Sequence, residues 1–111
     1  MDPMTILLVE DNADDELLAL RALKKTSVPS TVVVARDGEE ALEYIFGQGK
    51  YAGRDVSDQP KVVFLDLKLP KLNGIDVLRS IRKDSRTSRV PVVLLTSSDE
   101  RQDLLDGYDS G

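Results

Sequence analysis

The sequence contains no cysteine and no histidine in its 111 residues. The first absence excludes disulfides, thiolate metal sites and cysteine nucleophiles, and the second removes the commonest general base and the usual zinc ligand. No apolar run approaches the roughly 20 residues that cross a bilayer. The start of the chain, interrupted by Asp2 and Pro3, does not resemble a signal peptide. We therefore expect a cytoplasmic protein with no membrane contact.

Positive charge is also in short supply, since 20 acidic residues face 15 basic ones and the net charge is -5. Binding to nucleic acid without regard to sequence depends on clustered cations, so we expect no nucleic-acid partner. A chain of 111 residues has room for one hydrophobic core. We therefore expect a single domain over residues 1–111.

Short apolar runs alternate with amphipathic segments along the chain. The runs are residues 5–9, 31–35, 62–65 and 90–95. Runs of this length, rich in β-branched residues, are typical of strands that are buried on both faces of a parallel sheet. Helices are predicted after the caps Asn12, Asp37 with Glu40, and Ser97 with Glu100, and also over residues 74–83. This alternation predicts an α/β fold with a doubly wound parallel sheet.

Polar side chains follow three of these runs: Glu10 and Asp11 the first, Asp66 the third and Thr96 the fourth. Ligands bind at the carboxyl ends of the strands in open parallel sheets, so we expect these side chains to meet there. Each acid alone is as easily explained as a helix cap, the commoner role of acids at helix N-termini. Together they predict a site.

Clustered carboxylates need a proton or a cation, because two unit charges about 4 Å apart repel by roughly 4 kcal/mol at an effective dielectric of 20. Oxygen ligands without histidine or cysteine favour a hard divalent ion, and Mg²⁺ fits best. A carboxylate beside Mg²⁺ can accept a phosphoryl group to form an acyl phosphate. The predicted chemistry is phosphoryl acceptance.

Residues 47–60 contain three glycines and mixed charges without periodicity. This connection is longer than the usual two to six residues, and we expect a solvated, mobile insertion. An alternative is that Tyr51 and Arg54 contact a partner.

Three segments at these separations carry a resemblance to a known family. They read I-L-L-V-E-D-N at 6–12, V-V-F-L-D-L-K-L-P-K-L-N-G at 62–74 and V-V-L-L-T-S-S at 92–98. The chain resembles, over nearly its whole length, the receiver domain of bacterial two-component response regulators. The resemblance implies a flavodoxin-like fold with strand order 2-1-3-4.

The resemblance also implies a role for each matching residue. Asp66 would be the phosphoacceptor, and the metal-binding acids would be Glu10, Asp11 and Asp66. Lys68 would lend its backbone carbonyl to the Mg²⁺, Thr96 would be the switch hydroxyl, and Ser97 would line the site. The phosphoryl donor would be a histidine of a sensor kinase. The protein would act as a phosphorylated switch in signal transduction and not as a turnover enzyme.

The insertion at 47–60 and the E-D-N-x-x-D start resemble single-domain regulators that serve phytochrome-type kinases. Because no DNA-binding domain follows Gly111, we expect output through a downstream protein partner.

Receiver domains continue into a fifth strand that ends in Lys-Pro and then a fifth helix, whereas this sequence stops at Gly111. We therefore expect a receiver domain truncated before its fifth strand, without the lysine that pairs with the phosphoryl group. Residues 92–95 would form an apolar edge, and such edges invite pairing with another chain. A homodimer through the fourth strand and helix is the corresponding expectation.

Other families fit less well. A haloacid-dehalogenase-type phosphatase needs a second acid where Lys68 stands, and a nucleotide-binding domain needs a glycine-rich loop after the first strand. The alternative that remains is a receiver-like interaction module that is never phosphorylated.

Overall fold

The computed structural model describes residues 4–25, 29–67, 69 and 72–95, and the structural statements below concern these residues. The elements follow one another as β1 (Met4–Val9), α1 (Ala13–Lys24), β2 (Ser30–Ala35), α2 (Gly38–Phe46), the 3₁₀ turn η1 (Gly49–Tyr51), β3 (Val62–Asp66), α3 (Gly74–Lys83) and β4 (Val92–Leu95). None of the helices in these ranges could cross a bilayer, and the longest, α1, has 12 residues.

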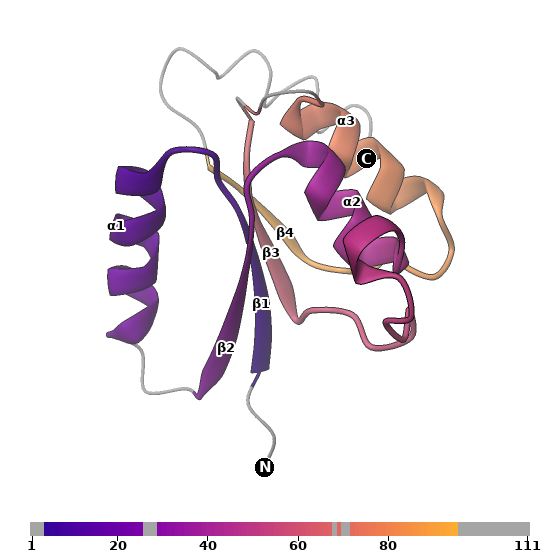
Figure 1. Ribbon diagram of the computed structural model, residues 1–111, viewed down its shortest axis with the longest axis horizontal. Coiled ribbons are helices and arrows are strands. Elements are labelled where there is room, and N and C mark those ends of the chain that lie inside the picture. Colours follow the sequence, from indigo (N-terminus) through magenta and orange to yellow (C-terminus); the bar gives the residue numbers. More distant parts are fainter. Residues whose placement is uncertain (1–3, 26–28, 68, 70–71, 96–111) are drawn as a thin grey trace.

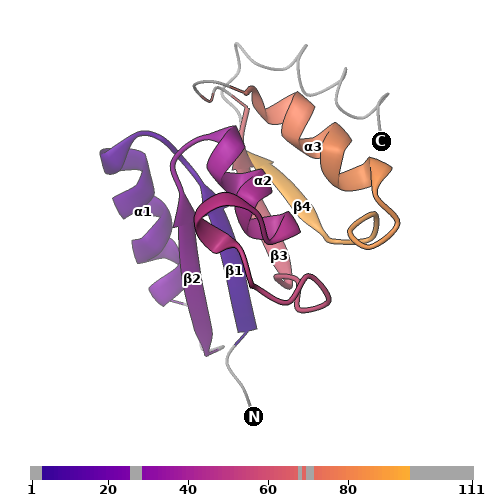
Figure 2. The same cartoon turned by 45° about the vertical axis from the view of Figure 1, so that its right-hand side comes forward.

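The strands form one parallel sheet in the order β2-β1-β3-β4. Leu7 of β1 lies opposite Val33 of β2 on one side and Val63 of β3 on the other. Figure 1 shows α1 on one face of the sheet and α2 with α3 on the opposite face, and the turned view in Figure 2 agrees. The doubly wound fold and its strand order are therefore confirmed.

Two of the predicted helix caps are present, and a third accompanies them. The Asn12 side chain accepts from the backbone N–H groups of Asp14 and Asp15 at 2.9 and 3.1 Å. The Asp37 carboxylate accepts from the Glu40 N–H at 2.7 Å. Asn73 caps α3 in the same way. Each cap satisfies an N–H group that a helix start leaves without an intrahelical partner. The Ser97 and Glu100 cap lies outside the described residues.

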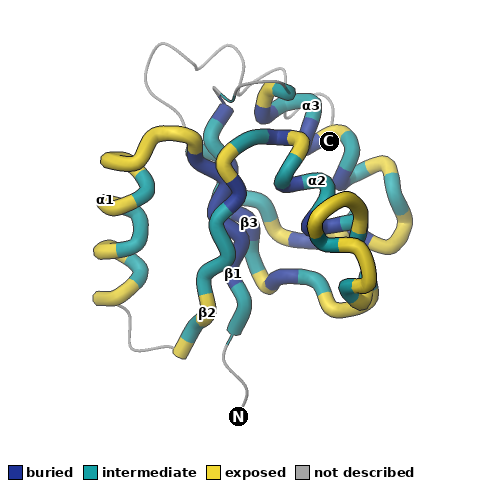
Figure 3. Tube along the Cα trace, in the orientation of Figure 1, coloured by how far each residue is buried: buried dark blue, intermediate teal, exposed yellow. Residues whose placement is uncertain are grey.

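The core lies between the sheet and the pair α2 and α3. Its strand residues alternate along the chain, and its members include Leu7, Val9, Val63, Leu65, Ala41, Ile45, Val77 and Ile81. Figure 3 shows the central strands as the most deeply buried part of the trace. Each large apolar side chain buried in this way contributes roughly 1.5 to 3 kcal/mol, so this cluster is a major source of the domain's stability.

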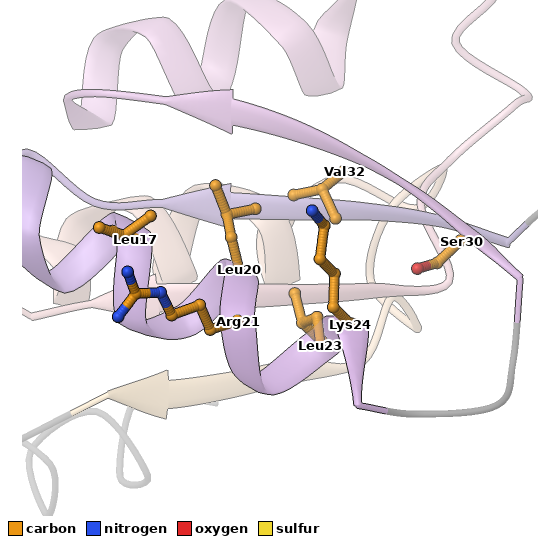
Figure 4. A pocket seen from close by; sticks show the side chains of 7 residues that line it. All are labelled: Leu17, Leu20, Arg21, Leu23, Lys24, Ser30 and Val32. Atoms are coloured by element: carbon orange, nitrogen blue, oxygen red, sulfur yellow. The ribbon is translucent and has the colours of Figure 1, made fainter.

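Helix α1 packs less tightly than the other two helices. It has no buried residue, and Leu17 and Leu18 are 47% and 61% exposed. A hollow of about 430 Å³ separates it from β2 (Figure 4). The lining residues are Leu17, Leu20, Arg21, Leu23, Lys24, Ser30 and Val32. The α1 face of the sheet is therefore less completely covered by the described residues than the opposite face.

The segment 47–60 packs against the end of α2. Arg54 donates from Nε to the Tyr44 carbonyl at 2.6 Å and from Nη2 to the Ile45 carbonyl at 3.3 Å. The Tyr51 ring meets the Tyr44 ring edge to face, with centroids 5.0 Å apart. Most residues of the segment are nevertheless exposed to solvent, as expected for a solvated insertion. The expected mobility of the segment stays a prediction. Its backbone contacts leave no periodic pattern in the sequence, which is why the sequence did not reveal them. They also direct Arg54 toward the protein itself and not toward a partner.

Candidate metal centre

Three carboxylates meet at the carboxyl edge of the sheet. Val9 of β1 lies opposite Leu65 of β3. The next residue along each strand, Glu10 and Asp66, therefore lies beside the other at the carboxyl edge of the sheet. One carboxylate oxygen from each of Glu10, Asp11 and Asp66 lies within 4.8 Å of the other two. The predicted convergence of these acids is confirmed.

The members of this cluster differ in burial. Glu10 is only 4% exposed, whereas Asp66 is half-buried and Asp11 is exposed. The Glu10 backbone N–H donates to the Ala35 carbonyl at 2.9 Å, which continues the hydrogen bonding between β1 and β2 by one residue. The site is thus anchored on its Glu10 side and open to solvent on its Asp11 side.

Burial raises the pKa of Glu10 to about 7. The N–H of Asn12, which donates to Glu10 Oε1 at 3.1 Å, opposes this shift and lowers the pKa. A hydrogen bond to Asp66 and the charge of Asp66 raise it again. The cluster therefore holds more negative charge than it can stabilise alone, and a proton or a cation would relieve it.

The donor set suits a hard divalent ion. All three side chains offer carboxylate oxygens, and no histidine or cysteine exists in the sequence to favour a softer metal. Mg²⁺ typically binds through one or two carboxylates and completes its octahedron with water and phosphate oxygens. The half-open position of Asp66 leaves room for such further ligands.

Two glycines hold the segment that follows Asp66. A Cβ atom on Gly74 would lie 2.6 Å from the Asp66 carbonyl oxygen and 2.7 Å from Leu67 Cα. A Cβ atom on Gly38, at the start of α2, would collide with the Leu72 carbonyl. The start of α3 therefore fixes the backbone at Asp66 and Leu67, and the start of α2 fixes the backbone at Leu72. The role of Gly38 has only a weak signal in the sequence, which is its place directly after the predicted cap Asp37.

Arg36 stands at the end of β2, next to this edge of the sheet. Its Nη1 lies 2.6 Å from Glu16 Oε1 in the first turn of α1. The pair joins two elements that border the acidic cluster. Nothing in the local sequence pattern pointed to it, because the two residues are 20 positions apart.

The other predicted site residues, Lys68, Thr96 and Ser97, lie outside the described residues. Their roles stay predictions, as does the last predicted helix.

Comparison with known proteins now bears on the identity of the chain. The family model described as "Response regulator receiver domain" matches residues 6–111. The chain belongs to this family. The resemblance noted in the sequence is thereby confirmed, and the receiver domain can be compared with its relatives.

Among curated proteins, this receiver domain is 36% identical over 107 residues to response regulator Rcp1 of Synechocystis sp., covering 96% of the present chain and 71% of Rcp1. Over 108 residues it is 40% identical to the probable methanogenesis regulatory protein FilR2 of Methanothrix harundinacea, covering 96% of the present chain and 66% of FilR2. The chain thus spans about two thirds of these relatives' lengths.

Solved structures give the same fold. The bacteriophytochrome response regulator AtBRR is similar with a TM-score of 0.88 and 48% identity, covering 100% of the present chain and 79% of that one. The phosphorylated cyanobacterial phytochrome response regulator RcpA gives 0.87 and 40%, covering 98% and 76%. The Mn²⁺-bound form of Rcp1 gives 0.87 and 35%, covering 97% and 76%.

Proposed function

We propose that this receiver domain accepts a phosphoryl group on Asp66 from a histidine of a sensor kinase, with Mg²⁺ as its cofactor. The observation that carries the proposal is the meeting of carboxylate oxygens from Glu10, Asp11 and Asp66 within 4.8 Å. The phosphorylated RcpA structure and the Mn²⁺-bound Rcp1 structure support it as properties of those two relatives.

Each acid has a task in this reaction. The side chains of Glu10, Asp11 and Asp66 would hold the metal, which supplies positive charge for the phosphoryl oxygens. Asp66 is half-buried at the end of β3, so a donor can reach this residue from solvent. An Asp66 oxygen bonds to phosphorus as the bond from phosphorus to the donor histidine breaks, and the departing imidazole nitrogen takes up a proton.

The roles of Lys68, Thr96 and Ser97 belong to the same proposal. The Lys68 carbonyl would complete the metal ligands, the Thr96 hydroxyl would move toward the new phosphoryl group, and Ser97 would line the site. Phosphorylation adds about 1.5 to 2 negative charges, by analogy with hydroxyl phosphates. That charge would bias the segment after β4 and with it a surface that binds a downstream protein. The domain thus acts as a switch and not as a turnover enzyme.

A phytochrome-type sensor kinase in the cytoplasm is the proposed donor, because RcpA is a phytochrome response regulator and AtBRR a bacteriophytochrome response regulator. A homodimer through the fourth strand and the helix after it is a further element of the proposal. Val93 on β4 is 43% exposed, and β4 pairs with β3 along one edge. An apolar side chain exposed beside a strand edge supports association there.

Acetyl phosphate with and without Mg²⁺ tests the phosphoacceptor. We expect intact-protein mass spectrometry to show one added phosphoryl group only when Mg²⁺ is present. Asp66→Asn should abolish it, and Asp58→Asn, which changes an exposed acid in the 47–60 segment, should not. Uptake that is absent in the unmodified protein would favour the interaction module that is never phosphorylated.

A further inference from the structure

A shallow groove of about 520 Å³ runs along α2 on the face of the sheet opposite α1. Its lining residues are Glu39, Leu42, Glu43, Gln48, Gly49 and Leu72. Leu72 comes from the connection between β3 and α3, and the others come from α2 and the turn after it. Figure 2 shows α2 on the near side of the sheet, so this groove faces away from α1. It is separate from both the acidic cluster and β4.

The floor of the groove is apolar and fixed. Leu42 and Leu72 are partly buried and pack against the hydrophobic core. The backbone of Leu72 sits directly on the first turn of α2, since a Cβ atom on Gly38 would collide with the Leu72 carbonyl. The groove is therefore a preformed binding surface, which lowers the entropy cost of binding a partner.

The far end of the groove is held in the same way. Gly47 ends α2 with φ of 62°, and Gly49, which lies against the Glu43 carboxylate, has φ of 53°, a backbone conformation that favours glycine. The Lys50 N–H donates to Glu43 Oε2 at 3.2 Å. These contacts fix the Glu43 carboxylate at one wall of the groove.

Among the described residues, the charged ones that line the groove are both acidic, Glu39 and Glu43. Lys50 places its ammonium 3.0 Å from Glu40, which does not line the groove, and also interacts with the charge of Glu43. Glu39 is exposed on the first turn of α2. The groove therefore combines an apolar floor with negative walls.

We propose that this groove is a docking site for a basic protein segment. An aliphatic side chain of the segment would lie over Leu42 and Leu72, and flanking lysine or arginine side chains would pair with Glu39 and Glu43. Apolar contact at the centre with charge complementarity at the rim is the usual arrangement of a transient protein interface. This surface is additional to the one that phosphorylation of Asp66 would switch.

A titration followed by NMR tests the docking site. The protein is the complete ¹⁵N-labelled chain with Asp66→Asn, so that the result does not depend on phosphorylation. The probe is a synthetic peptide with leucines flanked by lysines, and the control peptide has glutamates in place of the lysines. We expect the lysine peptide alone to shift the backbone amide signals of Leu42, Gln48, Gly49 and Leu72.

Charge reversal then tests the walls. Glu39→Lys should weaken binding of the lysine peptide about two- to tenfold, because each exposed ion pair contributes only modestly. The matched control is Asp14→Lys, which makes the same charge change on exposed α1 across the sheet and should leave the affinity unchanged. Glu39 and Asp14 are both exposed acids in the first turn of a helix, so the two substitutions change the helix start in the same way.

Three outcomes would overturn the proposal. The first is equal weakening by Glu39→Lys and Asp14→Lys, which would mean attraction to overall negative charge. The second is a set of shifts centred on Glu10, Asp11 and residue 66. The third is failure of the peptide to bind while Glu39→Lys abolishes self-association in sedimentation, which would assign the groove to a second copy of this chain.

Discussion

The Arg54 guanidinium lies 4.1 Å from the centroid of the Tyr44 ring and donates to the carbonyl of the same tyrosine at 2.6 Å. One side chain thus covers the ring and satisfies a carbonyl in the last turn of α2, where intrahelical partners run out. The segment 47–60 is thereby joined to the helix that precedes it.

Replacing Arg54 tests this attachment. Arg54→Ala leaves the Tyr44 carbonyl without its side-chain donor and removes the cation from the ring, so we expect a loss of about 2 kcal/mol in the free energy of unfolding. Arg54→Lys should recover little, because an ammonium cannot reproduce the planar fork. Urea denaturation of Arg86→Ala, whose exposed pair with Asp84 contributes about 1 kcal/mol or less, is the control. Equal losses in the two alanine variants would contradict the assigned role.

The raised pKa of Glu10 predicts that the free energy of unfolding of the metal-free protein depends on pH. Its value of about 7 exceeds the ordinary 4.5, so between these values the folded state binds more protons than the unfolded state. Stability contributed by this group is full below about pH 4.5, falls as the pH rises, and is lost above about pH 7. The contribution of Glu10 to the free energy of unfolding changes by at most about 3 kcal/mol across this pH range.

Glu10→Gln isolates this contribution. Without a titrating carboxyl, the variant should be more stable than the unmodified protein at pH 8 in the presence of a chelator. The difference should shrink toward pH 5. Thermal unfolding at several pH values measures it, and a constant difference across this range would show that Glu10 does not titrate as assigned.

Divalent metal should stabilise the folded chain, because the three-acid cluster exists only when the strands are assembled. At a hundredfold excess over its Kd, Mg²⁺ should add about 2.7 kcal/mol to the free energy of unfolding. Asp11→Asn and Asp66→Asn should remove most of this gain, and Asp14→Asn, on the neighbouring helix turn, should keep it. A gain that survives both cluster substitutions would place the metal elsewhere.

Gly74→Ala tests the support beneath Asp66. The added methyl would lie 2.6 Å from the Asp66 carbonyl oxygen, so the segment must shift, and we expect phosphoryl uptake from acetyl phosphate to slow about tenfold or more. Gly53→Ala is the matched control, because φ is 94° there but no heavy atom lies within 4 Å of the added Cβ. It should lower stability through backbone strain without changing the rate of uptake. Equal rates of phosphoryl uptake in both variants would show that the close approach of Gly74 does not position Asp66.

The alternation of apolar runs and caps was enough to predict the sheet, the three helices α1, α2 and α3 among the described residues, and the meeting of Glu10, Asp11 and Asp66. Burial on both faces requires continuous apolar runs, and parallel strands bring their carboxyl ends to one edge. The motifs in those same runs were enough to identify the receiver family. The contacts made by residues 47–60 were not predictable, because they connect a side chain to backbone carbonyls that any residue could supply.

The sequence by itself determined which residues form strands and helices and which acids share an edge, since period and strand direction are local properties of the chain. Only the tertiary structure decided that Arg54 reaches the end of α2, that Gly38 supports Leu72, and that burial raises the pKa of Glu10. These features depend on how closely segments distant along the chain approach one another. Side-chain packing sets that distance, and no short stretch of sequence encodes it.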